Sequence, residues 1–194
     1  MIAEHQRPIL SGFNAKSESS DVLNGVNLQD KVVIVTGGYS GIGIETTRGL
    51  ALAGAEVIIP AKRVDVAANN LNGIVSKENI YQMDLGDLNS VKSFTDKFKN
   101  KFSKLNILIN NAGIMACPET RVGKDWESQF AINHIGHFLL TKELMNVMAD
   151  TEGSRFVSLS SSAHSLTGIL WDDIHFSKQP YDKWMAYGQS KTAS

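Results

Sequence analysis

A glycine-rich segment, residues 36–43, has the residue types and spacing of a phosphate-binding turn. It follows a β-branched run at residues 32–35 and leads into an apolar stretch typical of a helix at residues 44–53. Glycine lets the backbone approach a pyrophosphate, and the free N–H groups and dipole of a helix N-terminus favour its negative charge. The alternative is an ordinary tight turn, but the flanking strand and helix favour a bound nucleotide. The residues predicted to contact it are Gly37, Tyr39, Ser40, Gly41, Ile42 and Gly43.

Two cations follow the second β-branched run, where dinucleotide-binding proteins place the group that recognises the ribose. An NAD enzyme usually has an acid there, whereas this chain has Lys62 and Arg63 and reaches its first acid only at Asp65. Both cations could pair with the 2′-phosphate of NADP. The alternative is that they are surface charges at the end of a strand. We predict NADP as the cofactor, with NAD still possible.

A tyrosine and a lysine near the C-terminus could carry out proton transfer. Tyr187 and Lys191 are four residues apart, so they share one face of a helix. A free tyrosine has a pKa of about 10, which is too high for an effective base at neutral pH. A neighbouring ammonium lowers that pKa because it favours tyrosinate. Such pairs are common, and a solvated helix face is the alternative interpretation.

The apolar pattern predicts the scaffold that must position these residues. Apolar runs without alternation are typical of strands covered on both faces, as in a parallel sheet between two layers of helices. Such runs occur at residues 32–35, 57–59, 80–83, 107–109 and 156–159. Helical patterns lie between them, so the order of elements predicts an α/β fold with a doubly wound parallel sheet and right-handed crossovers.

Two of the segments between these runs have clear helical patterns. In the first, apolar residues recur every three or four positions after Asp87, a predicted N-cap. These residues are Leu88, Val91, Phe94, Phe98 and Phe102. The second, residues 123–149, is apolar on more than one face, which predicts a long helix buried in the domain or at a subunit interface. Its His134 and His137 are not accompanied by other residues at spacings typical of metal ligands, so we interpret them as packing residues and predict no metal.

Length and composition exclude several classes of protein. The chain has 194 residues, with 19 Lys and Arg against 20 Asp and Glu, so it lacks the positive field that nucleic acids require. A single cysteine, Cys117, rules out an internal disulfide. The N-terminal residues hold no apolar run long enough for a signal peptide or a membrane span, so we predict a cytoplasmic protein without a membrane partner. Residues 1–30 are predicted to be an extension with one helical turn near Val22, and residues 31–194 a single domain.

The spacing of the glycine turn, T-G-x-x-x-G-x-G, resembles that of the short-chain dehydrogenase/reductase family. Residues 110–113 are similar to the family's N-N-A-G segment, and the Tyr/Lys pair follows in the family's order. Residues 111–115 and 160–164 look like the retinol-dehydrogenase-like and WW-domain-oxidoreductase-like branch, and other segments look like bacterial oxidoreductases of unassigned substrate. The resemblance covers nearly all of residues 31–194 and implies a Rossmann-type sheet.

The same resemblance implies contacts with the cofactor outside the glycine turn. Asp84 and Leu85 follow the third expected strand, where the family holds the adenine. A turn or a helix cap is the alternative role for Asp84. The other contacts that the resemblance implies come from Asn111, Ala112, Gly113, Tyr187 and Lys191.

The resemblance also implies a reaction, hydride transfer between the cofactor and a small carbonyl/alcohol substrate. Tyr187 would give a proton to the carbonyl oxygen, or accept one from the alcohol, beside the ammonium of Lys191. Ser161 would hydrogen-bond that oxygen, with either neighbouring serine as the alternative. Asn133 would hold a water molecule that links Lys191 to solvent.

Two functions are compatible with these features. The first is an NADP-dependent oxidoreductase, and the second is an incomplete or non-catalytic nucleotide-binding module without turnover. The family's sheet continues past the Tyr/Lys helix, whereas this chain stops at Ser194. We therefore expect an incomplete sheet with exposed apolar surface at its edge. A full-length parent would be expected to form homo-oligomers.

Overall fold

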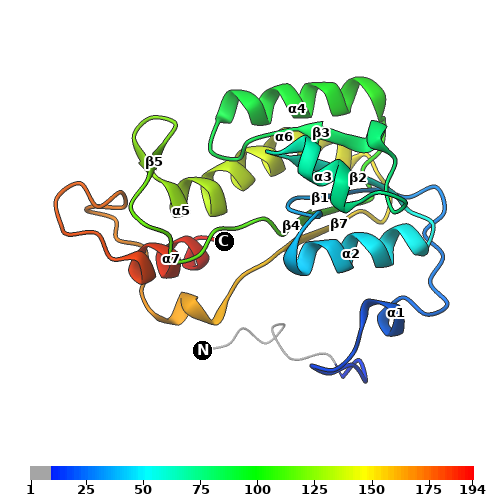
Figure 1. Cartoon of the computed structure of the whole chain (residues 1–194), viewed down its shortest axis with the longest axis horizontal. Helices are drawn as coiled ribbons and strands as arrows, with labels where there is room; N and C mark the ends of the chain where they lie inside the picture. Colours follow the sequence, from blue (N-terminus) through cyan, green and yellow to red (C-terminus); the bar gives the residue numbers. More distant parts are fainter. Residues whose placement is uncertain (1–9) are drawn as a thin grey trace.

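A five-stranded parallel sheet lies at the centre of the structure, a computed structural model that describes residues 10–194 (Figure 1). Its strands are β1 (Val32–Val35), β2 (Glu56–Ala61), β3 (Ile80–Gln82), β4 (Ile107–Asn110) and β7 (Arg155–Ser158). The order across the sheet is β3-β2-β1-β4-β7, and all neighbouring strands run parallel. The predicted α/β class and strands are confirmed. The strands after β1 are added first on one side of it, as β2 and β3, and then on the other side, as β4 and β7. A doubly wound fold binds its ligand at the carboxyl end of the strand where this order reverses, which here is β1.

Alternate residues of each strand face two separate cores. The helices that cover the sheet are α2 (Gly41–Leu52), α3 (Val64–Asn70), α4 (Leu88–Lys101) and α6 (His137–Ala149). Val32 and Ile34 of β1 pack in one core with residues of α4 and α6. Val33 and Val35 pack in the other core with residues of α2 and α3. Both faces of β1, β2 and β4 are therefore largely buried, which explains why these strands read as continuous apolar runs.

Helix α4 begins where the sequence predicts. The carboxylate of Asp87 accepts the N–H of Asn89 at 2.9 Å, which supplies one of the missing hydrogen bonds of the first turn. Phe94 and Phe98 are fully buried on the face that meets the sheet, and their ring centroids lie 6.3 Å apart. The polar face turns to solvent, as the amphipathic pattern requires.

The long helix predicted over residues 123–149 begins only at Ser128, so its first part is wrong. A short antiparallel hairpin, β5 (Arg121–Val122) and β6 (Trp126–Glu127), precedes it. Gly123 and Asp125 both have positive φ, at 59° and 65°, and together turn the chain back. Apolar periodicity does not detect this turn, because it is set by backbone angles rather than by side-chain character.

The helix itself changes winding along its length. It starts as α5 (Ser128–Phe130), widens into a π-helical turn at residues 131–136, and continues as α6. The buried carboxylate of Glu127 caps its start by accepting the N–H groups of Gln129 and Phe130, both at 2.8 Å. A π-turn rotates the residues within it relative to a regular helix, and such turns are frequent at functional sites.

The last helix, α7 (Lys183–Thr192), follows a long loop after β7. Asp182 caps it by accepting the N–H groups of Trp184 and Met185, both at 2.8 Å. Two 3₁₀ turns complete the connections, η1 (Lys77–Asn79) before β3 and η3 (Ser162–Ser165) after β7. Figure 1 shows α7 on the same side of the molecule as α5 and the β5 hairpin.

The N-terminal region contains the single helical turn that the sequence predicts, α1 (Ser19–Val22). It lies against α2, where a Cβ on Gly49 would come within 2.9 Å of the Ser19 side chain. The N–H of Leu28 then donates to the carbonyl of Ala53 at 2.8 Å and guides the chain into β1. Residues 19–29 therefore contact α2 and the turn that follows it.

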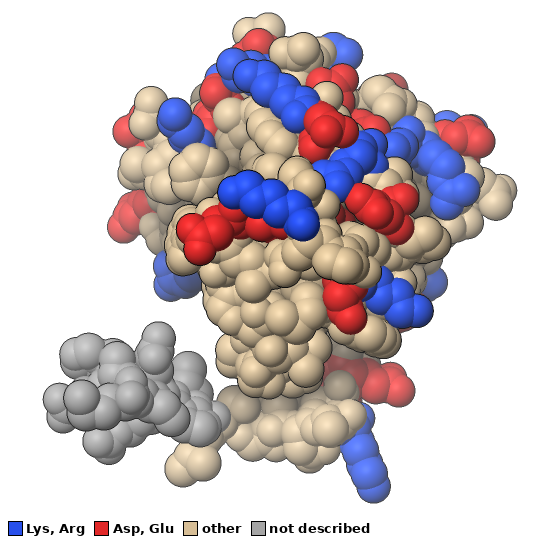
Figure 2. Space-filling view, turned by 90° about the vertical axis from the view of Figure 1, so that its left-hand side faces the viewer, with Lys and Arg blue, Asp and Glu red and all other residues tan. Residues whose placement is uncertain are grey.

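The surface has one apolar edge and no segregation of charge on the face that Figure 2 shows. Acidic and basic side chains are interspersed there. At the edge of the sheet, β7 pairs with β4 alone among the strands of residues 10–194, and Phe156 and Val157 are 50% and 43% exposed. The expectation of apolar surface at this edge is confirmed. Among the described residues, no helix has the length and apolar character needed to cross a bilayer.

Two leucine substitutions test this assignment of the core. Leu144 of α6 is fully buried, whereas Leu52 at the end of α2 is 81% exposed. We expect Leu144→Ala to lower the free energy of unfolding by about 2–5 kcal/mol, because it leaves a cavity. Leu52→Ala should change it by less than about 0.5 kcal/mol. Urea unfolding of both variants measures this, and equal losses would contradict the packing described above.

Candidate active site

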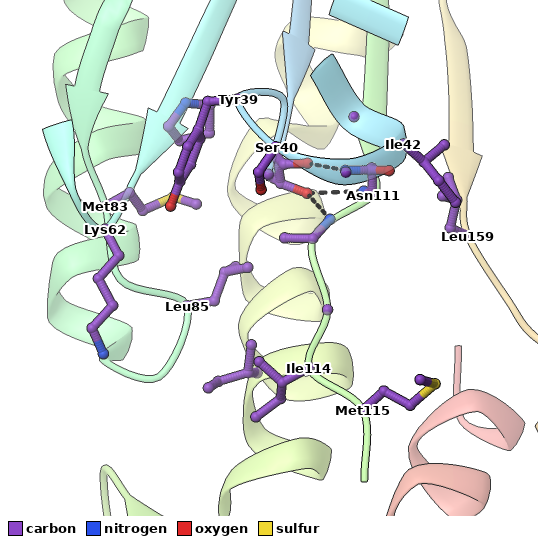
Figure 3. A pocket seen from close by; sticks show the side chains of 18 of the residues that line it. Tyr39, Ser40, Ile42, Lys62, Met83, Leu85, Asn111, Ile114, Met115 and Leu159 are labelled. Carbon is purple, nitrogen blue, oxygen red and sulfur yellow. Dashed lines mark hydrogen bonds between the residues drawn. The ribbon is translucent and has the colours of Figure 1, made fainter. Parts of the chain in front are cut away.

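A cavity of about 520 Å³ opens at the carboxyl ends of all five strands of the sheet (Figure 3). The predicted residues that line it are Gly37, Tyr39, Ser40, Gly41, Ile42, Gly43, Lys62, Asp84, Leu85, Asn111, Ala112, Gly113, Tyr187 and Lys191. Arg63, Ser161 and Asn133 were also predicted but do not line it. Ser160, an alternative to Ser161 in the sequence analysis, and Thr36 of the glycine-rich segment also line it, as do Pro60, Met83, Ile114, Met115, Ile132 and Leu159. Within residues 10–194, no three His, Cys, Asp or Glu side chains lie together in a way that could hold a metal ion.

The glycine turn joins β1 to α2 at a very close approach between backbone groups. A Cβ on Gly43 would overlap the carbonyl oxygen of Gly37 and lie 2.6 Å from Nδ2 of Asn111. That amide nitrogen donates to the carbonyl of Thr36 at 2.8 Å, so no space remains for a side chain at position 43. The N-cap residue of α2, Ser40, makes no side-chain bond to the first turn. The residues of the first turn, Gly41, Ile42 and Gly43, line the cavity, and their N–H groups have no side-chain cap.

The hydroxyl of Thr36 fastens the end of β1 to the end of β4. Its Oγ1 accepts the N–H groups of Asn111 and Ala112, both at 2.9 Å (Figure 3). The segment after β4 is thereby held against the glycine turn. This contact joins residues 75 and 76 positions apart, which the local sequence pattern does not reveal.

Lys62 and Asp84 form an ion pair at one end of the cavity. Lys62 Nζ lies 2.8 Å from Asp84 Oδ2 and bridges the loops that follow β2 and β3. The other carboxylate oxygen of Asp84 accepts the N–H of Gly86 at 2.9 Å, so the residue also has the turn-forming role considered from the sequence. Figure 3 shows Lys62 on the same side as Tyr39, with Ile42 on the opposite side. Arg63 begins α3 and is exposed outside the cavity wall.

Tyr187 and Lys191 lie on one face of α7, as their spacing predicts, and both are buried at the cavity. Lys191 Nζ lies 5.9 Å from the centroid of the Tyr187 ring and donates to the carbonyl of Leu159 at 2.8 Å. Burial lowers the pKa of Lys191 because it disfavours the charged ammonium. The Leu159 carbonyl gives the ammonium a strong acceptor at the end of β7.

The three candidate serines have different positions. Ser160 lines the cavity, and its hydroxyl donates to the carbonyl of Lys191 at 3.3 Å. Ser161 caps η3, because its Oγ accepts the N–H of Ala163 at 3.2 Å. Ser162 begins η3 and is exposed. The cavity wall therefore contains the serine before the one selected from the sequence.

Asn133 lies in the π-turn and clamps two neighbouring segments. Its Oδ1 accepts the N–H of Ile114, and its Nδ2 donates to the carbonyl of Ile114, both at 2.9 Å. Nδ2 also donates to the hydroxyl of Ser190 at 3.0 Å. The side chain is thus used to hold the segment after β4 against α7, in addition to any role with water. A Cβ on Gly113 would lie 3.4 Å from Asn133 Oδ1 and 3.8 Å from Lys191 Nζ, so both groups face one small space.

Comparison with known proteins agrees with this arrangement of turn, cavity and Tyr/Lys helix. The family model described as short chain dehydrogenase matches residues 31–194. The chain belongs to the short-chain dehydrogenase family. Members of this family are oxidoreductases, so the resemblance inferred from the motifs is confirmed.

The chain is similar to relatives from fungi and mammals and to a bacterial structure. It is 39% identical to the short-chain dehydrogenase/reductase prx1 of Penicillium roqueforti, over 86% of this chain and 51% of that protein. It is 38% identical to mouse retinol dehydrogenase 12, over 87% of this chain and 55% of that protein. A crystal structure of an uncharacterised Mycobacterium paratuberculosis protein superposes with a TM-score of 0.77 at 36% identity, over 86% of this chain and 59% of that one. The chain thus spans between half and three fifths of the length of these proteins.

A pair of glycine substitutions tests the close approach at the glycine turn. At Gly43 an added methyl group meets backbone and the Asn111 side chain, whereas at Gly168 it meets nothing within 4 Å. We expect Gly43→Ala to cost about 1–3 kcal/mol of stability, because the overlap forces backbone to move. Gly168→Ala should stay within about 0.5 kcal/mol of the parent. Urea unfolding gives both values, and a Gly43→Ala variant as stable as the control would refute the role of this glycine.

Proposed function

We propose that this chain carries the nucleotide-binding and proton-transfer parts of an NADP-dependent oxidoreductase acting on a small carbonyl/alcohol pair. The observation that carries the proposal is that the glycine turn and the Tyr187/Lys191 pair open onto one cavity. A bound nicotinamide nucleotide would supply or take up the hydride, while the protein provides position and electrostatics. The cytoplasmic location and the formation of homo-oligomers stay predictions from the sequence.

The cavity has the features that a dinucleotide requires. The first turn of α2 directs N–H groups without side-chain partners into it, which suits a pyrophosphate. The absence of a Cβ at Gly43 allows the backbone to come close to that group. A volume of about 520 Å³ lies in the usual range for ligand sites, roughly 300–1,000 Å³. Asn111, Ala112 and Gly113 form the opposite wall.

The preference for NADP rests on the charge at the end of β2. Lys62 and Arg63 are both exposed, and no acidic residue follows β2 before Asp65. Lys62 keeps two of its three N–H donors beyond the bond to Asp84, so it can pair with a 2′-phosphate without releasing that carboxylate. Asp84 and Leu85 are proposed to face the adenine. Arg63, outside the cavity wall, would approach the phosphate from the start of α3.

Tyr187 is proposed to transfer the proton to or from the substrate oxygen. Lys191 stands on the same helical face, with its ammonium 5.9 Å from the centroid of the Tyr187 ring, where its positive charge can balance the negative charge on the tyrosine oxygen as the proton leaves. The bond from Lys191 Nζ to the Leu159 carbonyl keeps the ammonium directed at the cavity. Lys191 is also proposed to bind the nicotinamide ribose with its remaining donors.

Ser161 is proposed to donate to the substrate oxygen, although Ser160 lines the cavity. The hydroxyl hydrogen of Ser160 is used by the carbonyl of Lys191, whereas Ser161 only accepts a bond and keeps its hydrogen free. Asn133 is proposed to hold a water molecule that reaches Lys191. Its Oδ1 uses one of two acceptor positions on Ile114, and the space beside Gly113 separates it from Lys191 Nζ.

Charge reversal at the end of β2 tests the cofactor preference. We expect Lys62→Asp/Arg63→Asp to raise the Kd for NADPH at least about tenfold, because two charge-assisted contacts are lost and two repulsive charges are added. The Kd for NADH should change little. The control, Lys97→Asp/Lys104→Asp, alters the net charge equally at exposed positions outside the cavity wall. Fluorescence titration of both variants gives the values, and unchanged NADPH affinity in the first would remove the preference.

Removal of the phenolic hydroxyl tests the reaction. We expect Tyr187→Phe to abolish NADPH oxidation with a panel of aldehydes and ketones and to leave the Kd for NADPH within about twofold, because the proton donor alone is lost. Near-normal turnover in Tyr187→Phe would disprove the role of Tyr187. Binding of NADPH without any oxidation by the parent chain would instead support the alternative, a nucleotide-binding module without turnover, for which the exposed edge at β7 is the structural argument.

A further inference from the structure

One buried histidine lies between the glycine turn and the π-turn, and both of its ring nitrogens have partners. His137 is the first residue of α6 and is only 5% exposed. Its Nε2 lies 2.9 Å from Oγ1 of Thr36, and its Nδ1 lies 2.9 Å from the carbonyl oxygen of Asn133. The sequence interpretation as a packing residue is therefore incomplete, because the ring bridges two polar groups from distant parts of the chain.

The hydrogen atoms in this bridge can be assigned by counting donors and acceptors. Thr36 Oγ1 already receives two N–H groups, those of Asn111 and Ala112, which occupy both of its lone pairs. Its single hydrogen must then point outward, and His137 Nε2 at 2.9 Å is nearer than the carbonyl of Ile109 at 3.4 Å. Nε2 is therefore the acceptor.

The proton of the neutral ring then lies on the other nitrogen. Nδ1–H of His137 donates to the carbonyl of Asn133, one helical turn earlier. The resulting chain of hydrogen bonds runs from the segment after β4, through the Thr36 hydroxyl and the imidazole, to the backbone of Asn133. Each group in this chain donates a hydrogen bond to the next one, so all of the bonds run in the same direction. Hydrogen bonds arranged in this way can strengthen one another.

We propose that His137 is a positioning residue which, as the neutral Nδ1–H tautomer, locks the glycine turn and the segment after β4 to the π-turn that carries Asn133. The inference deepens the proposed function, since it assigns to His137 the placement of that site. His137 does not line the cavity. It acts through Thr36, which sets the cofactor wall, and through Asn133, which fixes Ile114 and Ser190 beside Lys191.

Protonation of the ring would break this lock. An imidazolium has two N–H donors and no acceptor, and Thr36 Oγ1 has no lone pair left to receive the second one. The pKa of His137 is lowered to about 4, mainly by burial; the bond to the Asn133 carbonyl opposes this shift, and Lys191 and His134 add to it. Because this value lies below that of an unfolded histidine, about 6.5, the contribution is complete above pH 6.5 and is lost progressively as the pH falls toward 4. His137→Phe should lose this part of the acid dependence of unfolding.

Three variants distinguish the hydrogen-bonding role of His137 from simple packing of its ring. His137→Phe fills the same space without hydrogen bonds, and His137→Gln can still present an acceptor toward Thr36. Leu144→Ala lies on the same helix, is buried, and contacts neither partner of His137, so it serves as the control for lost stability. All measurements are made well below the unfolding temperature of the least stable variant.

The first readouts need no cofactor. Nitrogen-15 NMR of wild-type His137 at pH 7 is expected to show a proton on Nδ1 and none on Nε2. Amide hydrogen exchange of Asn111 and Ala112 should accelerate at least about tenfold in His137→Phe beyond any change in Leu144→Ala, because their acceptor becomes mobile. A proton on Nε2, or equal exchange in both variants, would overturn the inference. The tautomer measurement decides it even where His137→Phe does not fold.

The last readout is the Kd for NADPH. We expect it to rise about tenfold in His137→Phe, to stay within about threefold in His137→Gln, and to be unchanged in Leu144→Ala. Equal affinities of His137→Phe and the control would mean that His137 only stabilises the fold, which contradicts the proposal. If the wild-type chain binds neither NADPH nor NADH, the proposed function fails, while the tautomer and amide exchange still decide whether the lock exists.

Discussion

The cavity depends on one hydroxyl group, that of Thr36, which holds the carboxyl ends of β1 and β4 together. Adjacent parallel strands diverge once their ladder ends, and a cavity at that point has rigid walls only if something replaces the lost backbone bonds. Thr36 Oγ1 does so by receiving two N–H groups of the segment after β4, while Asn111 Nδ2 returns a bond to the Thr36 carbonyl. The glycine turn on one side and the wall formed by residues 111–113 on the other are fixed by this exchange.

A second constraint places the groups for chemistry against that rigid frame. Tyr187 and Lys191 stand on α7, which follows a long loop after the last strand of the sheet. Several hydrogen bonds hold α7, and two of them reach the frame close to the lysine: Lys191 Nζ donates to the Leu159 carbonyl, and Asn133 Nδ2 donates to the Ser190 hydroxyl. Both bonds involve residues at or next to Lys191. Stability of the helix and placement of the lysine therefore depend on the same contacts.

The sequence predicted those parts of the molecule whose cause is local. The strands follow from continuous apolar runs, and α4 follows from apolar periodicity and a capping aspartate. The positions of Gly37, Gly43 and the Tyr/Lys pair follow from spacing along the chain. The β5 hairpin was not predicted, because the pattern of apolar residues does not reveal the positive φ at Asp125 that turns the chain. The sequence also did not predict the Lys62–Asp84 pair, the Ser160 bond to α7 or the contacts of His137, because each joins segments that only the folded sheet brings together. A glutamate before a helix, as at Glu127, was an available signal for the true start at Ser128.

The π-turn explains how one short segment can contact both Thr36, which holds β1 and β4 together, and α7, which carries Tyr187 and Lys191. In a regular helix, Asn133 and His137 would lie one turn apart on the same face, and the Asn133 carbonyl would be taken by the backbone N–H of residue 137. In the widened turn at residues 131–136, the Asn133 carbonyl receives the His137 ring, while the Asn133 side chain reaches Ile114 and Ser190. The backbone of Asn133 is thereby tied to Thr36 and its side chain to α7. A single irregular turn thus connects the frame that would hold the nucleotide to the helix that would transfer the proton.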